Sequence, residues 1–334
     1  MKQHNSLRVL LLVAATALIF STIWSTTIAQ AATSSTRIRF DKGATSAVVS
    51  GDLPANGSAH YVLYAGYGQL MDVVLSAPEL VQLKVTTTSG HVLTPIPGIS
   101  GSTGFRGYLP YSGDYYITVT AGSQAVSYSL NVFIPIRIRF AKGATSKTLT
   151  AHLNAHQGLD YIARAANGQI LEVNATPAIS GATLQLIIYG VDGTVLRSGM
   201  AEGSSFIGEL PLSEDYIISV RAGEAATDFT LQVIVPQTIR FASGAYSGSV
   251  NTYLPAGHTQ YYVLGAGKDQ TMKVAISPKT GLKLVIEGMD GTVLKSANSG
   301  GASFSGTLPS TQDYFLTVAN TGNSISYWMT VTIR

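Results

Sequence analysis

The chain repeats itself three times. The tripeptide Ile-Arg-Phe occurs at residues 38–40, 138–140 and 239–241, and the landmarks that follow each copy keep the same order, 98 to 101 residues apart. These landmarks are Gly43, Gly143 and Gly244; Gln69, Gln169 and Gln270; Phe105, Phe206 and Phe304; the Leu-Pro pairs at 109, 210 and 308; and the Asp-Tyr pairs at 114, 215 and 313. Solenoid repeats span only about 20–50 residues, so each copy is a whole domain in tandem with the others.

Each copy has the hydrophobic pattern of β-strands. Large and small side chains alternate with period two in runs such as 115–120, 128–132 and 327–331, and Val, Ile, Thr and Tyr dominate these runs. Asp192-Gly193 and Asp290-Gly291 lie between apolar runs and are typical of tight hairpin turns. No run of ten residues has convincing helical amphipathicity. We therefore predict an all-β chain of three tandem antiparallel β-sandwiches.

The joints between copies are short. Ile134-Pro135-Ile136 and Val235-Pro236-Gln237 lead almost directly into the next Ile-Arg-Phe, with no Gly/Ser tract to act as a flexible linker. We place the three sandwiches at residues 32–135, 136–236 and 237–334.

Residues 1–31 have the pattern of a signal peptide. Lys2 and Arg8 precede an apolar run from residue 9 to 24, and Ala29-Gln30-Ala31 supplies the small residues of a cleavage site. We predict cleavage after Ala31 and a protein that is secreted or displayed at a bacterial cell surface, with no membrane association after cleavage. The alternative is an uncleaved anchor, for which the apolar run is slightly short. The chain has no cysteine, which excludes disulfides, a lipid-anchored cysteine and thiol chemistry.

Four motifs occur in order: Gly-Gln-x-(Leu/Met)-x-Val, Asp-Gly-Thr-Val-Leu, Leu-Pro-x-x-x-Asp-Tyr-x-(Ile/Leu)-x-Val and Tyr-x-Leu-x-Val. The second copy shows them best, with the first three at residues 168–173, 192–196 and 210–220. This order resembles the bacterial pre-peptidase C-terminal domain superfamily, which is similar to the inhibitors of goose-type lysozyme. The resemblance implies a jelly-roll-like sandwich that serves as an accessory module of secreted proteins. The acidic calcium-binding strand of many such domains and the Arg-rich loop of the inhibitors are both missing from this sequence.

The composition excludes several classes of function. Lys and Arg exceed Asp and Glu by only 21 to 18, without a basic run, which excludes a nucleic-acid binder. Apolar residues make up 46% and charged residues 12% of the chain, which excludes intrinsic disorder. No Gly-x-Ser-x-Gly motif occurs, the histidines do not recur in register, and Glu79, Glu172 and Glu202 are isolated. We therefore predict a protein that is not an enzyme and that has no catalytic residues, cofactor or metal site.

Residues shared by the three copies are expected to build the framework. We expect the Asp of each Asp-Tyr pair to accept hydrogen bonds from backbone N–H groups in a turn, with a calcium ligand as the alternative. The repeated Gln residues are expected to satisfy backbone groups where a strand begins. The repeated Tyr and Phe residues are expected to fill the cores.

Residues that differ between copies are the candidates for specific contacts. The first copy alone has Tyr64, Tyr67, Tyr108 and Tyr111, and the third adds Tyr246, Tyr253 and Tyr261. Exposed tyrosines suit stacking on sugar rings or on a protein, so the first four are the predicted binding residues. The alternative is that they pack between sandwiches or decorate polar strands. The resulting hypothesis is a non-catalytic binding or structural array that engages envelope or extracellular polysaccharide or a surface protein; a secreted inhibitor of a lysozyme-type glycan hydrolase is the alternative.

Overall fold

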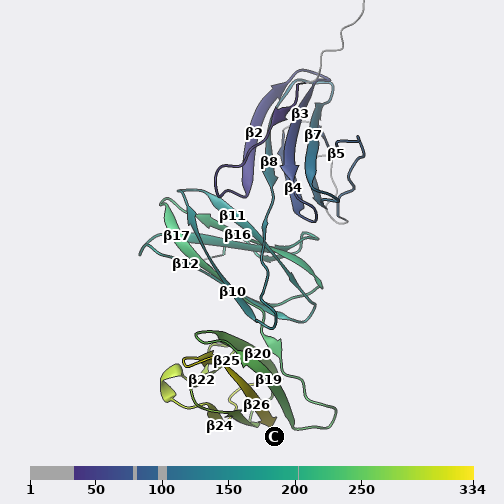
Figure 1. Ribbon diagram of the computed structural model, residues 1–334. Coiled ribbons are helices and arrows are strands. Elements are labelled where there is room, and N and C mark those ends of the chain that lie inside the picture. Colours follow the sequence, from purple (N-terminus) through teal and green to yellow (C-terminus); the bar gives the residue numbers. More distant parts are fainter. Residues whose placement is uncertain (1–33, 78–80, 97–103, 202) are drawn as a thin grey trace, which may run out of the picture. The chain divides into compact units, whose positions relative to one another are not determined.

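The computed structural model describes residues 34–77, 81–96, 104–201 and 203–334, and residues 35–334 form one compact unit (Figure 1). The predicted signal peptide, residues 1–31, lies outside the described residues. Almost all regular structure is β-strand, and the described part contains one short 3-10 turn, Ala297–Ser299. No helix of this part is long and apolar enough to cross a membrane.

The strands form six sheets, two for each copy of the repeat. In the first sandwich, sheet A has the order β1(Thr36–Arg37), β3(Ser58–Ala65), β7(Gly113–Ala121), β5(Val81–Thr87), and sheet B has the order β2(Ser46–Leu53), β8(Val126–Phe133), β4(Leu70–Ser76), β6(Gly104–Tyr108). In the second, sheet C has the order β14(Val195–Arg197), β13(Leu184–Gly190), β16(Glu214–Ala222), β11(Gly158–Ala165), β9(Ile136–Arg137), and sheet D has the order β10(Ser146–Leu153), β17(Thr227–Ile234), β12(Ile170–Pro177), β15(Ser205–Glu209). In the third, sheet E has the order β18(Gln237–Thr238), β20(Thr259–Ala266), β25(Gln312–Asn320), β22(Leu282–Gly288), β23(Val293–Lys295), and sheet F has the order β19(Ser247–Leu254), β26(Ile325–Ile333), β21(Thr271–Ser277), β24(Ser303–Thr307).

This arrangement confirms the predicted fold class of three antiparallel β-sandwiches. One detail differs from the prediction: the two-residue strands β1, β9 and β18 pair in parallel with β3, β11 and β20. Each of these short strands ends immediately before an Ile-Arg-Phe tripeptide, at residues 38–40, 138–140 and 239–241. The chain therefore enters each sandwich in one sheet and continues into the other sheet. The boundaries placed at residues 135 and 236 stay predictions.

Each sandwich has its own hydrophobic core. The tyrosines of the three Asp-Tyr pairs are fully buried in these cores, and each hydroxyl donates to the carbonyl oxygen four residues earlier, at 2.6–2.7 Å. Phe105 is buried, while Phe206 and Phe304 are partly buried against their cores. The core role predicted for the repeated aromatic residues is therefore confirmed.

The shared polar residues act partly as expected. The side-chain oxygens of Gln69, Gln169 and Gln270 accept a hydrogen bond from the backbone N–H three residues earlier, just before a strand, as predicted. The prediction for the Asp-Tyr aspartates is wrong about the partner, because Asp114 and Asp215 accept their hydrogen bonds from the guanidinium groups of Arg37 and Arg137. The parallel strands β1 and β9 bring these arginines beside the carboxylates.

The backbone turn role belongs instead to the Asp-Gly pairs. Asp192 and Asp290 accept from the N–H groups of Thr194 and Thr292, at 2.8 and 2.9 Å. Gly193 and Gly291 adopt positive φ angles of 94° and 83°, which a residue with a side chain would find costly. The predicted tight turns at these pairs are confirmed.

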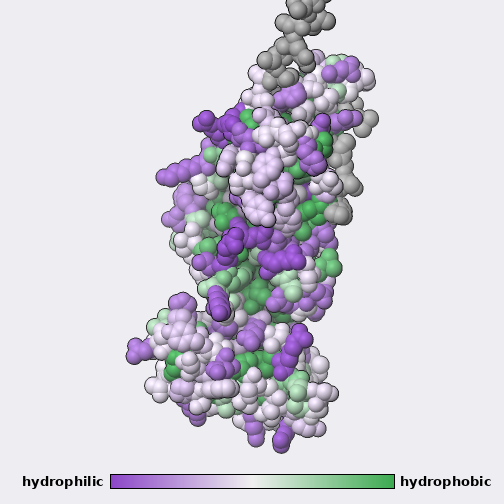
Figure 2. Space-filling model, turned by 45° about the vertical axis from the view of Figure 1, so that its right-hand side comes forward, coloured by the Kyte–Doolittle hydropathy of each residue, from purple (hydrophilic) through white to green (hydrophobic). Residues whose placement is uncertain are grey.

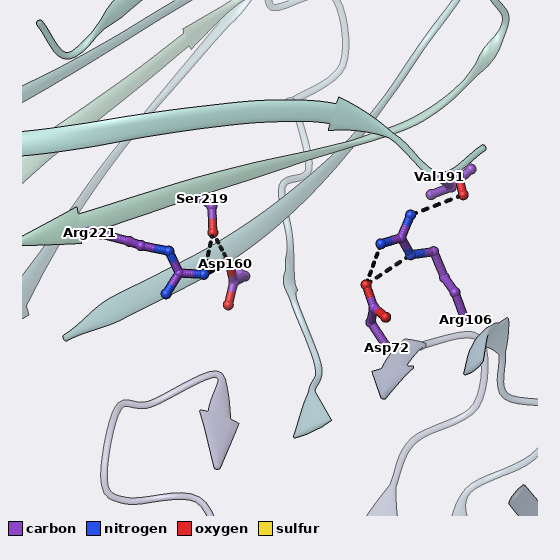
Figure 3. Close-up of polar contacts among 6 residues, drawn as sticks. All are labelled: Asp72, Arg106, Asp160, Val191, Ser219 and Arg221. Atoms are coloured by element: carbon purple, nitrogen blue, oxygen red, sulfur yellow. Dashed lines mark hydrogen bonds and ion pairs between the residues drawn. The ribbon is translucent and has the colours of Figure 1, made fainter. Parts of the chain in front are cut away.

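Polar groups are buried where the first sandwich meets the second (Figure 3). Arg106 donates to Asp72 within sheet B, at 2.8 Å through Nε, and to the carbonyl oxygen of Val191 in the second sandwich at 3.3 Å. The guanidinium also lies over the ring of Tyr189, 5.0 Å from its centroid. A small apolar cluster surrounds this contact, made of Leu70, Ile162, Val191 and Ile217.

A threonine makes the same contact at both joints. Thr45 Oγ1 accepts from the backbone N–H of Asp160 at 2.8 Å, and Thr145 Oγ1 accepts from that of Tyr261 at 2.8 Å. Ser219 donates to the carboxylate of Asp160, and Arg221 lies 3.8 Å from it (Figure 3). Thr45 also donates to this carboxylate. In the third sandwich the equivalent residue is Tyr246, because its carbonyl oxygen accepts the same backbone hydrogen bond as the carbonyl oxygens of Thr45 and Thr145.

The Asp215 site gives the chain a predicted acid sensitivity. Burial would raise the pKa of Asp215, but hydrogen bonds from Arg137 and Tyr108 outweigh burial and lower it below its usual value. A carboxylate with a depressed native pKa stabilises the fold above its unfolded pKa of about 3.9, and this stabilisation disappears as the pH falls through the native value. We expect Asp215→Asn to lower the melting temperature at pH 7 but to lower it much less at pH 3. Thermal unfolding followed by circular dichroism at both pH values tests this; an equal loss at both would contradict it.

Candidate functional site

The outer face of sheet F in the third sandwich is the candidate site. Strand β26 shows which side chains belong to the outer face. Tyr327, Met329 and Val331 are fully buried in the core, so the residues between them point outward. The outward residues of the four strands are Ser247, Ser249, Asn251 and Tyr253 on β19; Ser326, Trp328, Thr330 and Thr332 on β26; Thr271, Lys273, Ala275 and Ser277 on β21; and Ser303, Ser305 and Thr307 on β24. The face is therefore composed mainly of hydroxyl groups, with two aromatic rings.

Trp328 and Tyr253 form an aromatic pair at one end of this face. Their side chains are 60% and 64% exposed. Trp328 lies directly opposite Asn251 on the neighbouring strand, and Tyr253 is two residues farther along, in the diagonal position about 7–8 Å away where large rings come within reach of each other. The two rings and the Asn251 amide therefore lie on the same exposed part of the sheet.

This aromatic pair is peculiar to the third sandwich. The matching positions hold Asp52 and Ser129 in the first sandwich and His152 and Thr230 in the second, as the strand registers show. The framework does not need aromatic rings at these two positions, so the two rings are a feature of the third sandwich that an external contact would explain.

The other end of sheet F is cationic and hollowed. Thr271, Lys273, Thr332 and Arg334 line a hollow of about 430 Å³. The guanidinium of Arg334 lies 5.9 Å from the ring centroid of Tyr246, whose side chain is 65% exposed. Among the outward residues of β19, β21, β24 and β26 there is no Asp or Glu.

The same region of the first two sandwiches is covered rather than open. Positions equivalent to Thr271 hold Leu70 and Ile170, which are 1% and 3% exposed. Positions equivalent to Lys273 hold the acids Asp72 and Glu172, and burial raises the pKa of both, with Arg106 opposing the rise at Asp72 and Asn174 opposing it at Glu172. At these positions the third sandwich therefore has a hydroxyl group and a cation, where the first two sandwiches have the apolar and acidic residues of a covered sheet face.

The four predicted binding residues of the first sandwich do not act as one group. Tyr64 on β3 and Tyr67 in the following turn are 64% and 76% exposed. Tyr108 on β6 donates its hydroxyl to Asp215 of the second sandwich, so it contributes to a joint. Tyr111 stacks on the buried Tyr115, with ring centroids 5.1 Å apart. Tyr64 and Tyr67 keep the exposure that binding requires.

In the part of the chain that the structure describes, the histidines and carboxylates form no cluster of the kind that a metal needs. His152 pairs with Asp228 and His156 lies 3.4 Å from Glu224, and all four side chains are well exposed. No group of three or more metal-ligating side chains occurs within the described residues.

Figure 2 shows one face of the molecule, on which hydrophilic side chains predominate and hydrophobic ones are scattered.

Sequence reasoning missed Trp328 although the signal was present. Tyr327-Trp328-Met329 had been recognised as an alternating strand, and alternation alone places Trp328 on the side opposite to its two neighbours. What alternation does not supply is which face of each sandwich is uncovered. That depends on the contacts between sandwiches.

Comparisons with known proteins assign no family. No protein-family model matches the chain, and no curated protein matches it. Among solved structures, the chain is similar to periplasmic inhibitors of g-type lysozyme from Aeromonas hydrophila (21% identity, TM-score 0.27) and Salmonella Typhimurium (25% identity, TM-score 0.25), with 30% of this chain and 96% of each inhibitor covered. It is also similar to a protein of Sulfolobus turreted icosahedral virus (12% identity, TM-score 0.19), with 84% of this chain and 83% of that one covered. At these TM-scores the similarities assign no function, and the resemblance to the pre-peptidase C-terminal superfamily stays a prediction.

Proposed function

We propose that the protein is an exported, non-catalytic binding protein that holds a polysaccharide against the outer face of sheet F. The observation that supports this proposal is the exposure of Trp328 and Tyr253 on a sheet face otherwise composed mainly of hydroxyl groups. Aromatic rings stack on the apolar faces of sugars, and neighbouring hydroxyl and amide groups exchange hydrogen bonds with sugar hydroxyls.

The shape of the face favours an extended chain over a small molecule. Small-molecule ligands are usually enclosed in a concave pocket that buries most of their surface. The Trp328 end of sheet F is instead an open strand surface, where a long ligand gains affinity by making several weak contacts in succession. The export signal predicted at residues 1–31 would bring this surface to envelope or extracellular polysaccharides.

The single tryptophan of the processed protein allows a direct test. The chain has two tryptophans, and Trp24 lies in the predicted signal peptide, so residues 32–334 contain Trp328 alone. We expect soluble polysaccharides that bind to shift or quench its fluorescence. We expect Trp328→Ala to weaken their binding at least about tenfold, equivalent to about 1.4 kcal/mol, measured by titration calorimetry.

Tyr64→Ala provides the matched control, because Tyr64 is equally exposed but lies on the first sandwich. Its binding should match that of the unaltered protein. If Tyr64→Ala and Tyr67→Ala abolish binding while Trp328→Ala does not, the site is on the first sandwich as first predicted from sequence. If no polysaccharide binds and the protein inhibits a goose-type lysozyme, the proposal is overturned in favour of the alternative predicted from sequence.

A further inference from the structure

We propose that the hollow at Lys273 and Arg334 is a subsite for the carboxylate of an acidic sugar, so that the polysaccharide held on sheet F contains uronic acid residues. This inference rests on the proposed function, since it assigns one part of the same face to one chemical group of the ligand. The hollow has two cations and two threonine hydroxyl groups as its lining.

The charge at Lys273 is the first argument. The equivalent residues of the other two sandwiches are Asp72 and Glu172, so the sign of the charge is reversed in the sandwich where this position is exposed. A lysine that served only for solubility would not require this reversal, because an exposed carboxylate would do the same. The reversal is explained if the open face attracts an anion.

The fixed position of Arg334 is the second argument. Its main chain exchanges two hydrogen bonds with Thr271, from Thr271 N–H to the Arg334 oxygen at 2.6 Å and from Arg334 N–H to the Thr271 oxygen at 3.1 Å. The ring of Tyr246 lies beneath its guanidinium. The main-chain bonds place Arg334 beside the hollow, and the planar array of donors of its guanidinium matches a carboxylate.

The two ends of the face can serve one ligand. Trp328 and Thr332 lie on the same side of β26 and are separated by four residues, which is about 13 Å along a strand. An extended chain of a few sugar units can therefore stack on Trp328 and place an acidic group in the hollow. A uronic acid carries its carboxylate on the ring, so each unit offers both an apolar ring face and a charge; polymers linked by phosphate lack this regular combination.

A pair of ligands with the same backbone gives the sharpest test. We expect polygalacturonate to bind the processed protein at least about tenfold more tightly at 20 mM salt than fully methyl-esterified polygalacturonate, which has the same sugar rings and no charge. Lys273→Gln combined with Arg334→Gln should remove this preference by weakening the binding of polygalacturonate to the level of the methyl ester. Lys283→Gln, which removes an exposed lysine from sheet E, should change neither.

Each outcome separates this inference from the proposed function. Equal binding of both polymers by the unaltered protein would overturn the acidic subsite and leave polysaccharide binding in place. Binding of neither, nor of any other glycan, would overturn both. A preference that survives the double substitution, or tighter binding of inorganic polyphosphate than of polygalacturonate, would also overturn the assignment of the hollow to a sugar carboxylate.

Discussion

Arg106→Leu is expected to lower the free energy of unfolding of the first sandwich by about 3–5 kcal/mol, because it leaves a buried carboxylate without its cation. Asp72 receives hydrogen bonds from Nε and Nη2 of Arg106, and the exposed fractions of the two side chains are only 7% and 10%. The variant also loses the bond to Val191 and the contact with Tyr189. Chemical denaturation followed by circular dichroism measures the loss.

The pH dependence of this loss distinguishes a stranded charge from a packing defect. Burial already raises the pKa of Asp72, and Arg106 opposes that rise, so removing Arg106 should raise the pKa further. A carboxylate whose native pKa is raised destabilises the fold as the pH rises through that value, and it costs little below its unfolded pKa. The deficit of Arg106→Leu should therefore be larger at pH 8 than at pH 4.

The double variant Asp72→Leu/Arg106→Leu is the control. Replacing both members of a buried ion pair by apolar groups is often neutral or stabilising, so it should recover most of the stability lost in Arg106→Leu. An equal deficit in the single and double variants, at both pH values, would mean that the pair acts only by filling space.

Tyr262→Phe is expected to cost the third sandwich about 1–3 kcal/mol, because it leaves the hydroxyl of Tyr327 buried without a partner. Both side chains are fully buried and their oxygens are 2.6 Å apart. Tyr262 donates to Thr252 Oγ1 at 3.2 Å, which leaves Tyr327 as the donor between the two tyrosines. Burial raises the pKa of both hydroxyls, so both remain protonated in this network.

The direction of this chain of hydrogen bonds makes the two single variants unequal. Tyr327→Phe leaves Tyr262 its bond to Thr252, so it should cost less than Tyr262→Phe. The double variant should cost less than the sum of the two single variants, because removing both hydroxyls leaves no buried tyrosine hydroxyl without a partner. The second sandwich already has Phe229 opposite Tyr161 at the matching positions. Denaturation midpoints of the three variants provide the measurement, and equal losses in both single variants would contradict the assigned direction.

The sequence predicts the framework well because the framework repeats. Residues such as Gln169 and Tyr216 have the same local partners in every copy, so their spacing and their chemistry together specify what they do. The Asp-Tyr aspartates were misread because their partner is supplied by a strand that lies far away in sequence. Arg37 is 77 residues from Asp114, and only the parallel pairing of β1 brings them together.

The candidate site was harder to predict because exposure depends on how sandwiches meet. Tyr64 and Tyr108 are both tyrosines unique to the first copy, yet one is open to solvent and the other bonds to Asp215. Periodicity places Trp328 on the outward face of its strand, but only the strand register places Tyr253 near it on the neighbouring strand. The sequence shows that Leu70, Ile170 and Thr271 differ, but the reason for the difference becomes clear only once the joint is known.

The three copies are not interchangeable, and their order along the chain has a chemical direction. If a gene rearrangement placed the third copy ahead of another, Lys273 would occupy the buried place of Asp72, and Ser305 would stand at the position of Arg106, so a lysine would be buried at the joint without a counterion. Tyr246 would likewise stand where a compact threonine now fits. Duplication could therefore lengthen this protein from within, by copying the middle unit, far more readily than by adding units after the last.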